Sequence, residues 1–464
     1  MYLGAFEWRI EFPEVLDEEG NFIGFDCIIG NPPYIQLQSM GDDADILEQM
    51  EYETYARTGD IYCLFYEQGM NVLKEAGCLC YITSNKWMRA SYGENLRNYF
   101  ATKTNPILLV DFAGVKIFDS ATVETNILLI NKEVNRHSTL ACTFPNANGL
   151  NKMSVFVQQC GSLCEFSSSD SWVILSPIEQ SIKRKIEAVG TPLKDWDINI
   201  YRGVLTGYNE AFIISTEKRD EILANCHTDE ERSRTAELIR PILRGRDIKR
   251  YGYEWANLWL IWIPWHFPLH LDSTIEGASK KAEMEFEKQY SAVYNHLFEY
   301  KEPLSKRNKA ETGIRYEWYA LQRWGSKYWE DFLQPKIVWG EISDKSKFAF
   351  DFLGKYMPEA TAFYMRGEYI EFLLTALNSS VAEWLFSKVG TTTGVGTIRW
   401  KKYTIEQLIV AKPTIEQLNE HLAVFNKLKN NKITIREFKY YSNNLMYNIY
   451  GLNDEEISFI ENFQ

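Results

Sequence analysis

The most constraining feature of this sequence is an alternation of short apolar segments with amphipathic segments between residues 25 and 130. The apolar segments FDCIIG, GCLCYITS, ILLVDFAG and NILLI predict strands. Helices are expected at Ile61–Ala76 and around Tyr92–Ala101. Strands that alternate with helices are typical of an α/β fold with a mostly parallel sheet and crossover helices. Only 30 residues precede Asn31, which leaves room for one short strand, so we expect half of such a domain.

The remaining residues predict two further parts. Residues 145–171 are rich in Asn, Ser and Gly and indicate a loop or an excursion from the fold, and a connecting helix is expected at 176–190. Eleven of the 14 Trp lie between Trp196 and Trp400 in short mixed segments, which favours a separate mixed α+β domain. Helical patterns return near the C-terminus. The expected parts are an α/β domain at residues 1–175, an α+β domain at 176–412 and a helical tail at 413–464.

Composition excludes several classes of protein. The chain has 464 residues, of which 45% are apolar and 24% charged, as in ordinary globular proteins. It contains no run of about 18 consecutive apolar residues and lacks the layout of a signal peptide, so we expect a cytoplasmic protein without membrane spans. The eight cysteines include no CxxC pair, and no metal site is expected.

The charge distribution separates an acidic N-terminal segment from the rest. The net charge is −13, and residues 1–50 contain one Arg and eleven Asp or Glu, a balance of −10. The other 414 residues carry only −3. The overall acidity therefore does not argue against nucleic-acid binding by the later residues.

One four-residue turn, Asn31-Pro32-Pro33-Tyr34, directly follows the first predicted strand. Consecutive prolines end helices and strand ladders, so a tight structural turn is one interpretation. The other interpretation is chemical. An amino group conjugated to a ring is a poor nucleophile, and two acceptors that bind its N–H groups favour a pyramidal nitrogen with an exposed lone pair. Asn31 Oδ1 and the Pro32 carbonyl oxygen could be these acceptors, and Tyr34 could stack on the base.

Taken together, several segments resemble a known enzyme family. FDCIIGNPPYIQL, GDIYCLFYEQGMNVLKEAGCLCYITSNKW and VKIFDSATVETNILLI are similar to adenine-specific DNA methyltransferases, and more closely to type IIG restriction–modification enzymes of the Eco57I kind. The later segments YRGVLTGYNEAFII, LIRPILRGRDIKRY, QPKIVWGEIS and GTTTGVGTIRWKKYTIEQLIV resemble the TaqI-like specificity domain. The resemblance implies that residues 1–175 form the C-terminal half of a Rossmann-like methyltransferase sheet and that residues 176–412 form a target-recognition domain.

The resemblance also implies roles for individual residues. Asn31 and Pro32 would accept from the adenine N6 amino group, and Tyr34 would stack on the extruded base. Phe118 would pack on the other face of the base, with a core position as the alternative. Phe65 would line the adenine of S-adenosylmethionine, again with a core position as the alternative. Double-stranded DNA is the implied partner, and extruding its base costs on the order of a few kcal/mol.

The sequence also departs from the family pattern. The family holds S-adenosylmethionine with a glycine-rich turn and acidic residues that precede the NPPY turn, whereas the only GxG here is Gly394-Val395-Gly396. No Pro-Asp dipeptide is present to open a PD-(D/E)xK nuclease site. We therefore expect a truncated chain that lacks most of the cofactor site and is inactive alone. The first strand would expose an apolar edge, which favours self-association or docking on the missing N-terminal half.

Two basic segments are candidates for DNA contacts. Residues 231–251 hold seven basic and three acidic residues, and residues 388–402 hold four basic and no acidic residues. Such runs are often only solvated surfaces, but in this aromatic-rich domain they favour phosphate contacts, and arginine can also bind guanine bidentately. The small residues of the loop 390–397 could follow a DNA backbone closely. The predicted DNA-binding residues are Arg244, Arg246, Lys249, Arg250, Arg399, Lys401 and Lys402.

Three functions are compatible with these observations. The leading hypothesis is the DNA-recognition and partial catalytic portion of a site-specific adenine N6-methyltransferase. Transfer to cytosine N4 or to a protein glutamine amide would use the same turn, although the large second domain argues against a protein substrate. A non-catalytic DNA-binding specificity subunit is the third. A cytosine C5 mechanism needs a catalytic cysteine, usually after proline, and no proline here precedes a cysteine.

Overall fold

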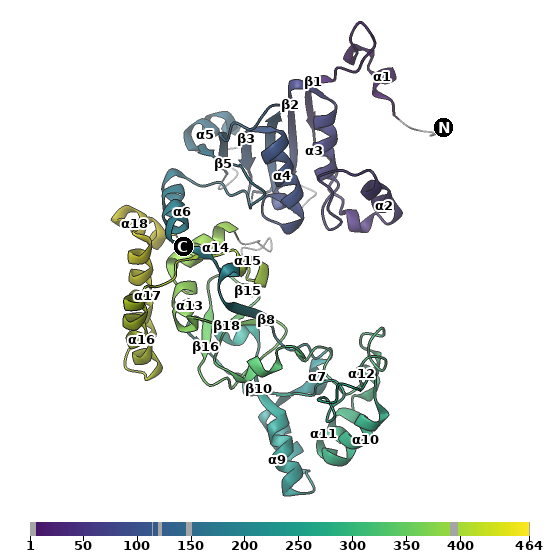
Figure 1. The fold of residues 1–464 in the computed structure, drawn as a ribbon, viewed down its shortest axis with the longest axis vertical. Coiled ribbons are helices and arrows are strands. Elements are labelled where there is room, and N and C mark those ends of the chain that lie inside the picture. Colours follow the sequence, from purple (N-terminus) through teal and green to yellow (C-terminus); the bar gives the residue numbers. More distant parts are fainter. Residues whose placement is uncertain (1–5, 114, 119–122, 145–150, 390–397, 464) are drawn as a thin grey trace. The chain divides into compact units, whose positions relative to one another are not determined.

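The computed structural model describes residues 6–113, 115–118, 123–144, 151–389 and 398–463. The chain divides into two compact units, Met1–Ile182 and Lys183–Gln464 (Figure 1). Within the described residues, no helix combines the length and the apolar character that crossing a membrane requires.

The first unit is built around a six-stranded sheet. Its strands are β1 (Phe25–Gly30), β2 (Leu73–Ser84), β3 (Asn105–Asp111), β4 (Thr125–Asn131), β5 (Thr139–Thr143) and β6 (Ser162–Cys164). They are ordered β1-β2-β4-β3-β5-β6. β1 pairs with β2 and β3 with β5 in parallel, whereas β4 is antiparallel to both of its neighbours and β6 is antiparallel to β5. β1, β2, β3 and β5 thus run in one direction, which agrees with the expected α/β fold with a mostly parallel sheet.

The described helices of this unit are α1 (Trp8–Glu11), α2 (Asp42–Gln49), α3 (Tyr62–Asn71), α4 (Glu94–Lys103) and α5 (Met153–Cys160). Of these, α3, α4 and α5 pack against strands of the sheet. α3 contacts β2, and α4 contacts β3 (Figure 1). Tyr62, Tyr66 and Met70 recur every four residues, so they share one face of α3, and they are buried with Leu79 and Tyr81 of β2. This apolar contact fixes α3 next to the strand that pairs with β1.

Two predicted segments differ from the structure. α3 ends at Asn71 and β2 already begins at Leu73, so the expected continuation of the helix to Ala76 is wrong. Leu73 pairs with Phe25 of β1, and Ala76 has a φ of 62°, which a right-handed helix does not allow. The interpretation of 145–171 as a loop is wrong at α5 and β6, whereas residues 165–171 contain no helix or strand.

The second unit contains two four-stranded sheets. Its strands are β7 (Thr191–Pro192), β8 (Ile198–Arg202), β9 (Ile213–Ser215), β10 (Ile239–Leu243), β11 (Ile248–Lys249), β12 (Gly252–Tyr253), β13 (Leu258–Ile261), β14 (Lys336–Gly340), β15 (Ile342–Ser343), β16 (Phe348–Asp351), β17 (Met357–Pro358), β18 (Ala362–Gly367), β19 (Ile398–Arg399) and β20 (Ile409–Val410). One sheet has the order β17-β10-β13-β9 and the other β16-β14-β18-β8. The short strands pair as β11-β12, β15-β19 and β20-β7.

Helices complete this mixed α+β architecture, which agrees with the expectation for the later residues. They are α6 (Pro177–Val189), which contains the boundary between the units, α7 (Asn209–Phe212), α8 (Thr216–Ala224), α9 (Asp229–Leu238), α10 (Lys280–Gln289), α11 (Ser291–Phe298), α12 (Lys301–Lys306), α13 (Ile370–Leu377), α14 (Ser380–Val389), α15 (Lys402–Glu406), α16 (Ile415–Lys429), α17 (Ile435–Tyr450) and α18 (Asp454–Asn462).

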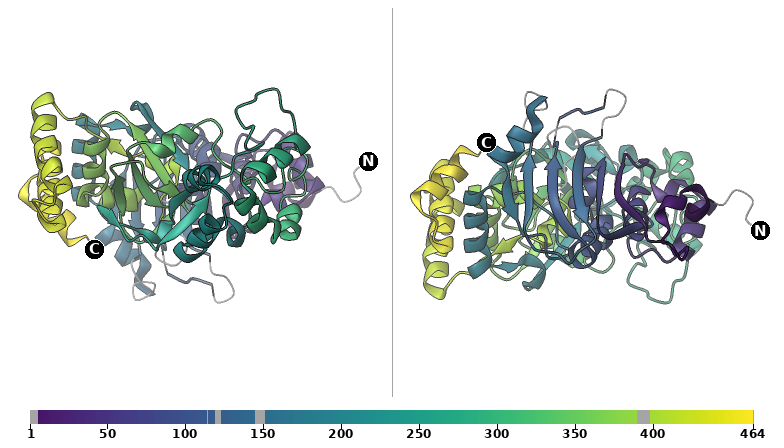
Figure 2. Two further views of the ribbon diagram at one scale, coloured as in Figure 1. Left: turned by 90° about the horizontal axis from the view of Figure 1, so that it is seen from below. Right: turned by 90° about the horizontal axis from the view of Figure 1, so that it is seen from above.

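The C-terminal helices pack against the rest of the second unit. α16 and α17 contact α13, and α17 and α18 contact α14, as the yellow helices in Figures 1 and 2 show. Ser380 N of α14 donates to Asn443 Oδ1 of α17, and Asn443 Nδ2 donates back to Ser380 Oγ, both at 2.9 Å. Lys185 of α6 binds Glu456 of α18 at 2.6 Å. The helices expected at 413–464 are present and belong to this compact unit.

We expect a pH-dependent loss of stability from His421 of α16. It is fully buried, with the ring centroids of Phe372 and Phe425 at 5.7 and 5.8 Å. Burial lowers the pKa of His421 from 6.5 to about 4. Between these pH values the unfolded chain binds a proton that the native state does not, so stability should fall with falling pH, by up to roughly 3 kcal/mol.

This prediction can be checked by urea unfolding at pH 7 and pH 4.5. His421→Phe fills a similar space without a titratable group, so its stability should depend less on pH than that of the wild type. Equal changes in the two proteins would contradict the assignment to His421.

Candidate functional site

The turn 31–34 leaves the carboxyl end of β1 and is held by the loop that precedes α3. Residues 35–37 run beside residues 59–61 and share two backbone hydrogen bonds of 2.9 Å with them. Pro32 is buried, whereas Asn31 is exposed. The backbone of the turn is therefore fixed while the Asn31 amide stays accessible to a ligand.

Tyr34 is anchored by two contacts. Its hydroxyl donates to the Ile82 carbonyl oxygen of β2 at 3.2 Å. Its ring meets that of Tyr62 edge to face, with a centroid distance of 6.1 Å and an interplanar angle of 88°. Burial raises the pKa of the Tyr34 phenol, so the ring stays neutral at physiological pH. An aromatic ring with a fixed plane is suited to stacking on a flat ligand.

A series of side-chain hydrogen bonds extends from Tyr62 to the loop beside the turn. The hydroxyl groups of Tyr62 and Tyr92 lie 2.8 Å apart, and the Tyr92 hydroxyl donates to Asp60 Oδ2 at 3.4 Å. Burial raises the pKa of Asp60, and the positive charge of Lys86 opposes this shift. These hydrogen bonds link the ring of Tyr62, which packs against Tyr34, to the loop that holds the turn. Sequence reasoning missed these residues, although the segment GDIYCLF marks two of them.

A second polar contact lies at the ends of β2 and β3. Asn85 Nδ2 donates to Asp111 Oδ1 at 2.8 Å. Asp111 is 2% exposed, and burial raises its pKa. Because β1, β2 and β3 run in the same direction, this contact shares the carboxyl edge of the sheet with the turn 31–34. That edge is where α/β folds commonly bind their ligands. Neither residue of this pair stands out in the sequence as a site residue.

Neither of the two phenylalanines with predicted roles is a core residue. Phe118 follows β3 and is partly exposed. Phe65 is 39% exposed on α3, whereas its neighbours Leu64 and Tyr66 are buried. Both rings are thus accessible, and their roles toward a base and a cofactor stay predictions.

The described residues fit only part of a site for S-adenosylmethionine. Phe65 offers one exposed apolar ring. The glycines that precede Asn31 stand singly, so no glycine-rich turn adjoins the NPPY turn from that side. A single aromatic side chain does not enclose a nucleoside, and the cofactor side of the site is therefore incomplete within these residues.

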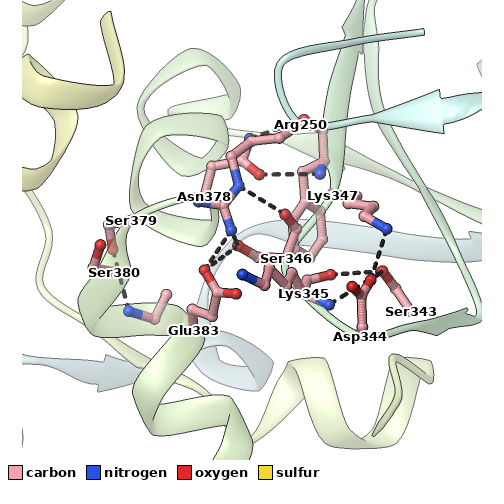
Figure 3. Close-up of polar contacts among 12 residues, drawn as sticks. Arg250, Ser343, Asp344, Lys345, Ser346, Lys347, Asn378, Ser379, Ser380 and Glu383 are labelled. Carbon is pink, nitrogen blue, oxygen red and sulfur yellow. Dashed lines mark hydrogen bonds and ion pairs between the residues drawn. The ribbon is translucent and has the colours of Figure 1, made fainter. Parts of the chain in front are cut away.

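Two of the seven predicted DNA-binding residues are engaged inside the second unit. Arg250 donates to Ser346 O and Oγ at 2.9 and 2.8 Å and pairs with Glu383 (Figure 3). Arg244 donates to Asp247 through Nε and Nη2 at 2.9 and 2.7 Å. These contacts give both arginines a structural task, and their contact with DNA stays a prediction.

The other five predicted DNA-binding residues are exposed. They are Arg246, Lys249, Arg399, Lys401 and Lys402. Within the described ranges, the side chains of Arg246 and Lys401 have no hydrogen bond or ion pair. The ion pairs of the other three are long, at 3.5 Å for Lys249, 3.9 Å for Arg399 and 3.6 Å for Lys402. Such exposed pairs are weak, so these cations remain available to phosphate groups. The loop 390–397 lies outside the described residues.

Two family models match this chain. Residues 2–118 match the Eco57I restriction-modification methylase, and residues 240–410 match the TaqI-like C-terminal specificity domain. The first range contains the turn 31–34, and the second contains all seven predicted DNA-binding residues. The chain thus contains a segment that matches a restriction-modification methylase and a segment that matches a specificity domain. More particularly, it carries an Eco57I-type methylase segment followed by a TaqI-like specificity domain.

Curated relatives agree with this assignment. The type II methyltransferase M.PaeR7I of Pseudomonas aeruginosa is 26% identical over 208 residues, which are 42% of this chain and 36% of the relative. The type II restriction enzyme and methyltransferase RM.Eco57I of Escherichia coli is 26% identical over 41% of this chain and 19% of its own length. The type II methyltransferase M.BstVI of Geobacillus stearothermophilus is 20% identical over 88% of this chain and 71% of its own length. The chain therefore spans well under half of the first two relatives.

A solved structure has a similar fold. The type IIL restriction-modification enzyme MmeI, solved in complex with DNA, aligns with 94% of this chain and 56% of its own chain. The TM-score is 0.54 and the sequence identity is 12%. The likeness therefore supports the fold.

We expect opposite effects from two neighbouring arginine substitutions. Arg250→Gln removes the guanidinium that pairs with Glu383 and binds Ser346, and it should lower stability by about 1–2 kcal/mol. Arg246→Gln removes an exposed cation that has no partner in the described ranges, so stability should change by less than about 0.5 kcal/mol. Arg246→Gln should instead weaken duplex binding severalfold and reduce its salt dependence.

Thermal unfolding and fluorescence anisotropy with a duplex at several salt concentrations would measure both effects. Arg250→Gln with unchanged stability and weakened DNA binding would show that the internal contacts of Arg250 are not its main role.

Proposed function

We propose that this chain is the DNA-recognition and target-base portion of a site-specific DNA adenine N6-methyltransferase of a restriction–modification system. The observation that carries the proposal is the arrangement at the end of β1, where Asn31 is exposed beside the anchored ring of Tyr34. It occurs in a chain that also carries a TaqI-like specificity domain, so double-stranded DNA is the proposed partner.

The chemistry of the turn follows from its hydrogen-bonding groups. Asn31 Oδ1 and the Pro32 carbonyl oxygen accept from the two N–H groups of an extruded adenine, which makes the nitrogen lone pair more available to a methyl donor. Tyr34 stacks on one face of the base and Phe118 packs on the other. Stacking and these hydrogen bonds offset part of the cost of unpairing the base. Phe65 would contribute one wall for S-adenosylmethionine.

We also propose that another strand adds to the open edge of β1. Among the described residues, β1 pairs only with β2. Ile29 of β1 is 79% exposed, and nearby in sequence Ile23 is 41% exposed. An open strand edge with apolar side chains favours pairing with further polypeptide. The added strand would come from an N-terminal methyltransferase half or from a second copy, and it would bring the cofactor side of the site.

The first test concerns the chain by itself. The purified chain should bind duplex DNA with an affinity that falls steeply with salt, and it should give no heat of binding with S-adenosylmethionine in titration calorimetry. No duplex binding would contradict DNA recognition. Cofactor binding by the chain alone would contradict the proposal that another segment completes the cofactor site.

The second test concerns the methylated atom. A cofactor-binding segment from an Eco57I-type relative is fused before residue 1, and DNA methylated by the fusion is hydrolysed to nucleosides. The label should appear in N6-methyladenine and should fall at least about 100-fold in Asn31→Ala, which lacks one acceptor. Label in N4-methylcytosine would overturn the adenine assignment. Gln38→Ala removes another exposed amide, four residues beyond the turn, and as the matched control it should keep the activity.

The strand edge gives a further prediction. Ile29→Lys places a charge on the open edge and should suppress concentration-dependent association in sedimentation velocity. Val134→Lys, at a position that is 86% exposed in the same unit, is the matched control and should associate like the wild type. A wild type that stays monomeric at high concentration, without the added half, would argue against self-association through this edge.

A further inference from the structure

A groove in the second unit brings together residues from several strand ends. Its volume is about 490 Å³, and Arg246, Glu341 and Thr361 contribute to its walls. Gly245 and Gly340 also line it, and their backbones touch, because a Cβ on Gly340 would lie 2.9 Å from Gly245 O. Part of the lining is thus bare backbone, and the lack of a side chain at both positions allows the two backbone segments to pack closely.

Glu341 at this groove holds an arginine that the sequence analysis did not single out. Arg202, the last residue of β8, donates from Nη2 to Glu341 Oε2 at 2.8 Å and from Nε to the Ala360 carbonyl oxygen at 2.8 Å. Its guanidinium carbon lies 5.7 Å from the ring centroid of Phe363. On the other side of the carboxylate, Arg399 Nη1 lies 3.9 Å from Glu341 Oε1.

These contacts fix Arg202 by one edge and leave the other edge open. A guanidinium has five N–H groups, and the two described bonds use the Nε–Nη2 edge. Three N–H groups keep no partner in the described part of the chain, and two of them lie in parallel on the Nη1–Nη2 edge. The side chain of Arg202 is 45% exposed, so this edge is within reach of a ligand.

An arginine in this state is suited to reading guanine. Guanine presents two acceptors, O6 and N7, at the major-groove edge, and they match two parallel N–H groups of a guanidinium. An arginine that only neutralises phosphate needs no fixed plane, whereas bidentate base recognition does. The Glu341 carboxylate, the Ala360 carbonyl oxygen and the Phe363 ring together hold the plane of the Arg202 guanidinium in one orientation. Arg246 beside the groove has no such tethers among the described residues and is better suited to a phosphate.

We propose that Arg202 reads a guanine of the target site and that Glu341 is its positioning residue. This inference rests on the proposed function, because it names the base that the specificity domain recognises. Arg399 shares the same carboxylate at a longer distance and is the neighbouring contact. The substrate class is therefore a duplex whose recognition sequence contains a guanine that Arg202 contacts.

The test is selection of binding sites from a pool of random duplexes by the purified chain, followed by sequencing. The wild type should enrich a motif that contains guanine. Arg202→Lys keeps the charge but loses the planar fork, so the preference for guanine at one position should fall roughly tenfold or more. Glu341→Gln keeps the size of the side chain but weakens the tether, and it should relax the same position. Arg315→Lys, at another exposed arginine with a carboxylate partner, is the matched control and should keep the full motif.

Loss of preference at one position in both Arg202→Lys and Glu341→Gln supports the inference. An unchanged motif in both variants overturns it, and so does an equal loss of affinity for all sequences, which would identify a phosphate contact. A wild type that binds no duplex overturns the proposed function itself. Circular dichroism of each variant shows that it is folded, and Glu341→Gln carries the test if Arg202→Lys does not fold.

Discussion

The parallel pairing of β1 with β2 is the interaction on which the candidate site depends. Gly30, the last residue of β1, lies opposite Tyr81, and a Cβ on Gly30 would come within 3.0 Å of that ring. The pairing places the following turn beside Ile82, whose carbonyl oxygen accepts from Tyr34. A register slip of one residue would turn the side chains of β1 to the opposite face. It would also move Tyr34 away from this carbonyl.

The second unit uses arginine in two distinct ways. Arg244 and Arg250 satisfy carboxylates and backbone groups inside the fold, where loss of the guanidinium would leave acceptors without a donor. Arg246 carries its charge in solvent, and Arg202 combines one tethered edge with one open edge. A basic segment in the sequence therefore shows where cationic side chains occur. The hydrogen bonds within the fold determine which of these side chains can contact a ligand.

The sequence predicted the features that short-range patterns determine, such as a single strand and the turn that follows it. The strand FDCIIG was placed at its observed bounds, and the turn after it could be interpreted chemically because its four residues are adjacent. The end of α3 was misplaced because it depends on the pairing of Leu73 with Phe25, which lies far away in the sequence.

Other residues of the two sites were missed for the same reason, because their contacts join residues that lie far apart in the sequence. Tyr92 lies 32 residues from Asp60, and Glu341 lies 139 residues from Arg202. Neither pair has a spacing that helix or strand periodicity could reveal, because the tertiary fold alone brings its members together. Exposure was equally hidden from the sequence, since Phe65 lies on a helix whose neighbouring positions are buried. A pattern of apolar residues thus identified the helix but not which of its rings stays accessible.

The two candidate sites are built from contacts within separate units. The turn 31–34 is fixed by β2 and by the loop before α3, whereas Arg202 is fixed by residues that flank β14 and β18. Substitutions at sites that share no partners usually have additive effects. Changes around Glu341 can therefore alter which sequence is bound without disturbing the acceptors at Asn31. Under the proposed function, this separation allows recognition to change while the chemistry is kept.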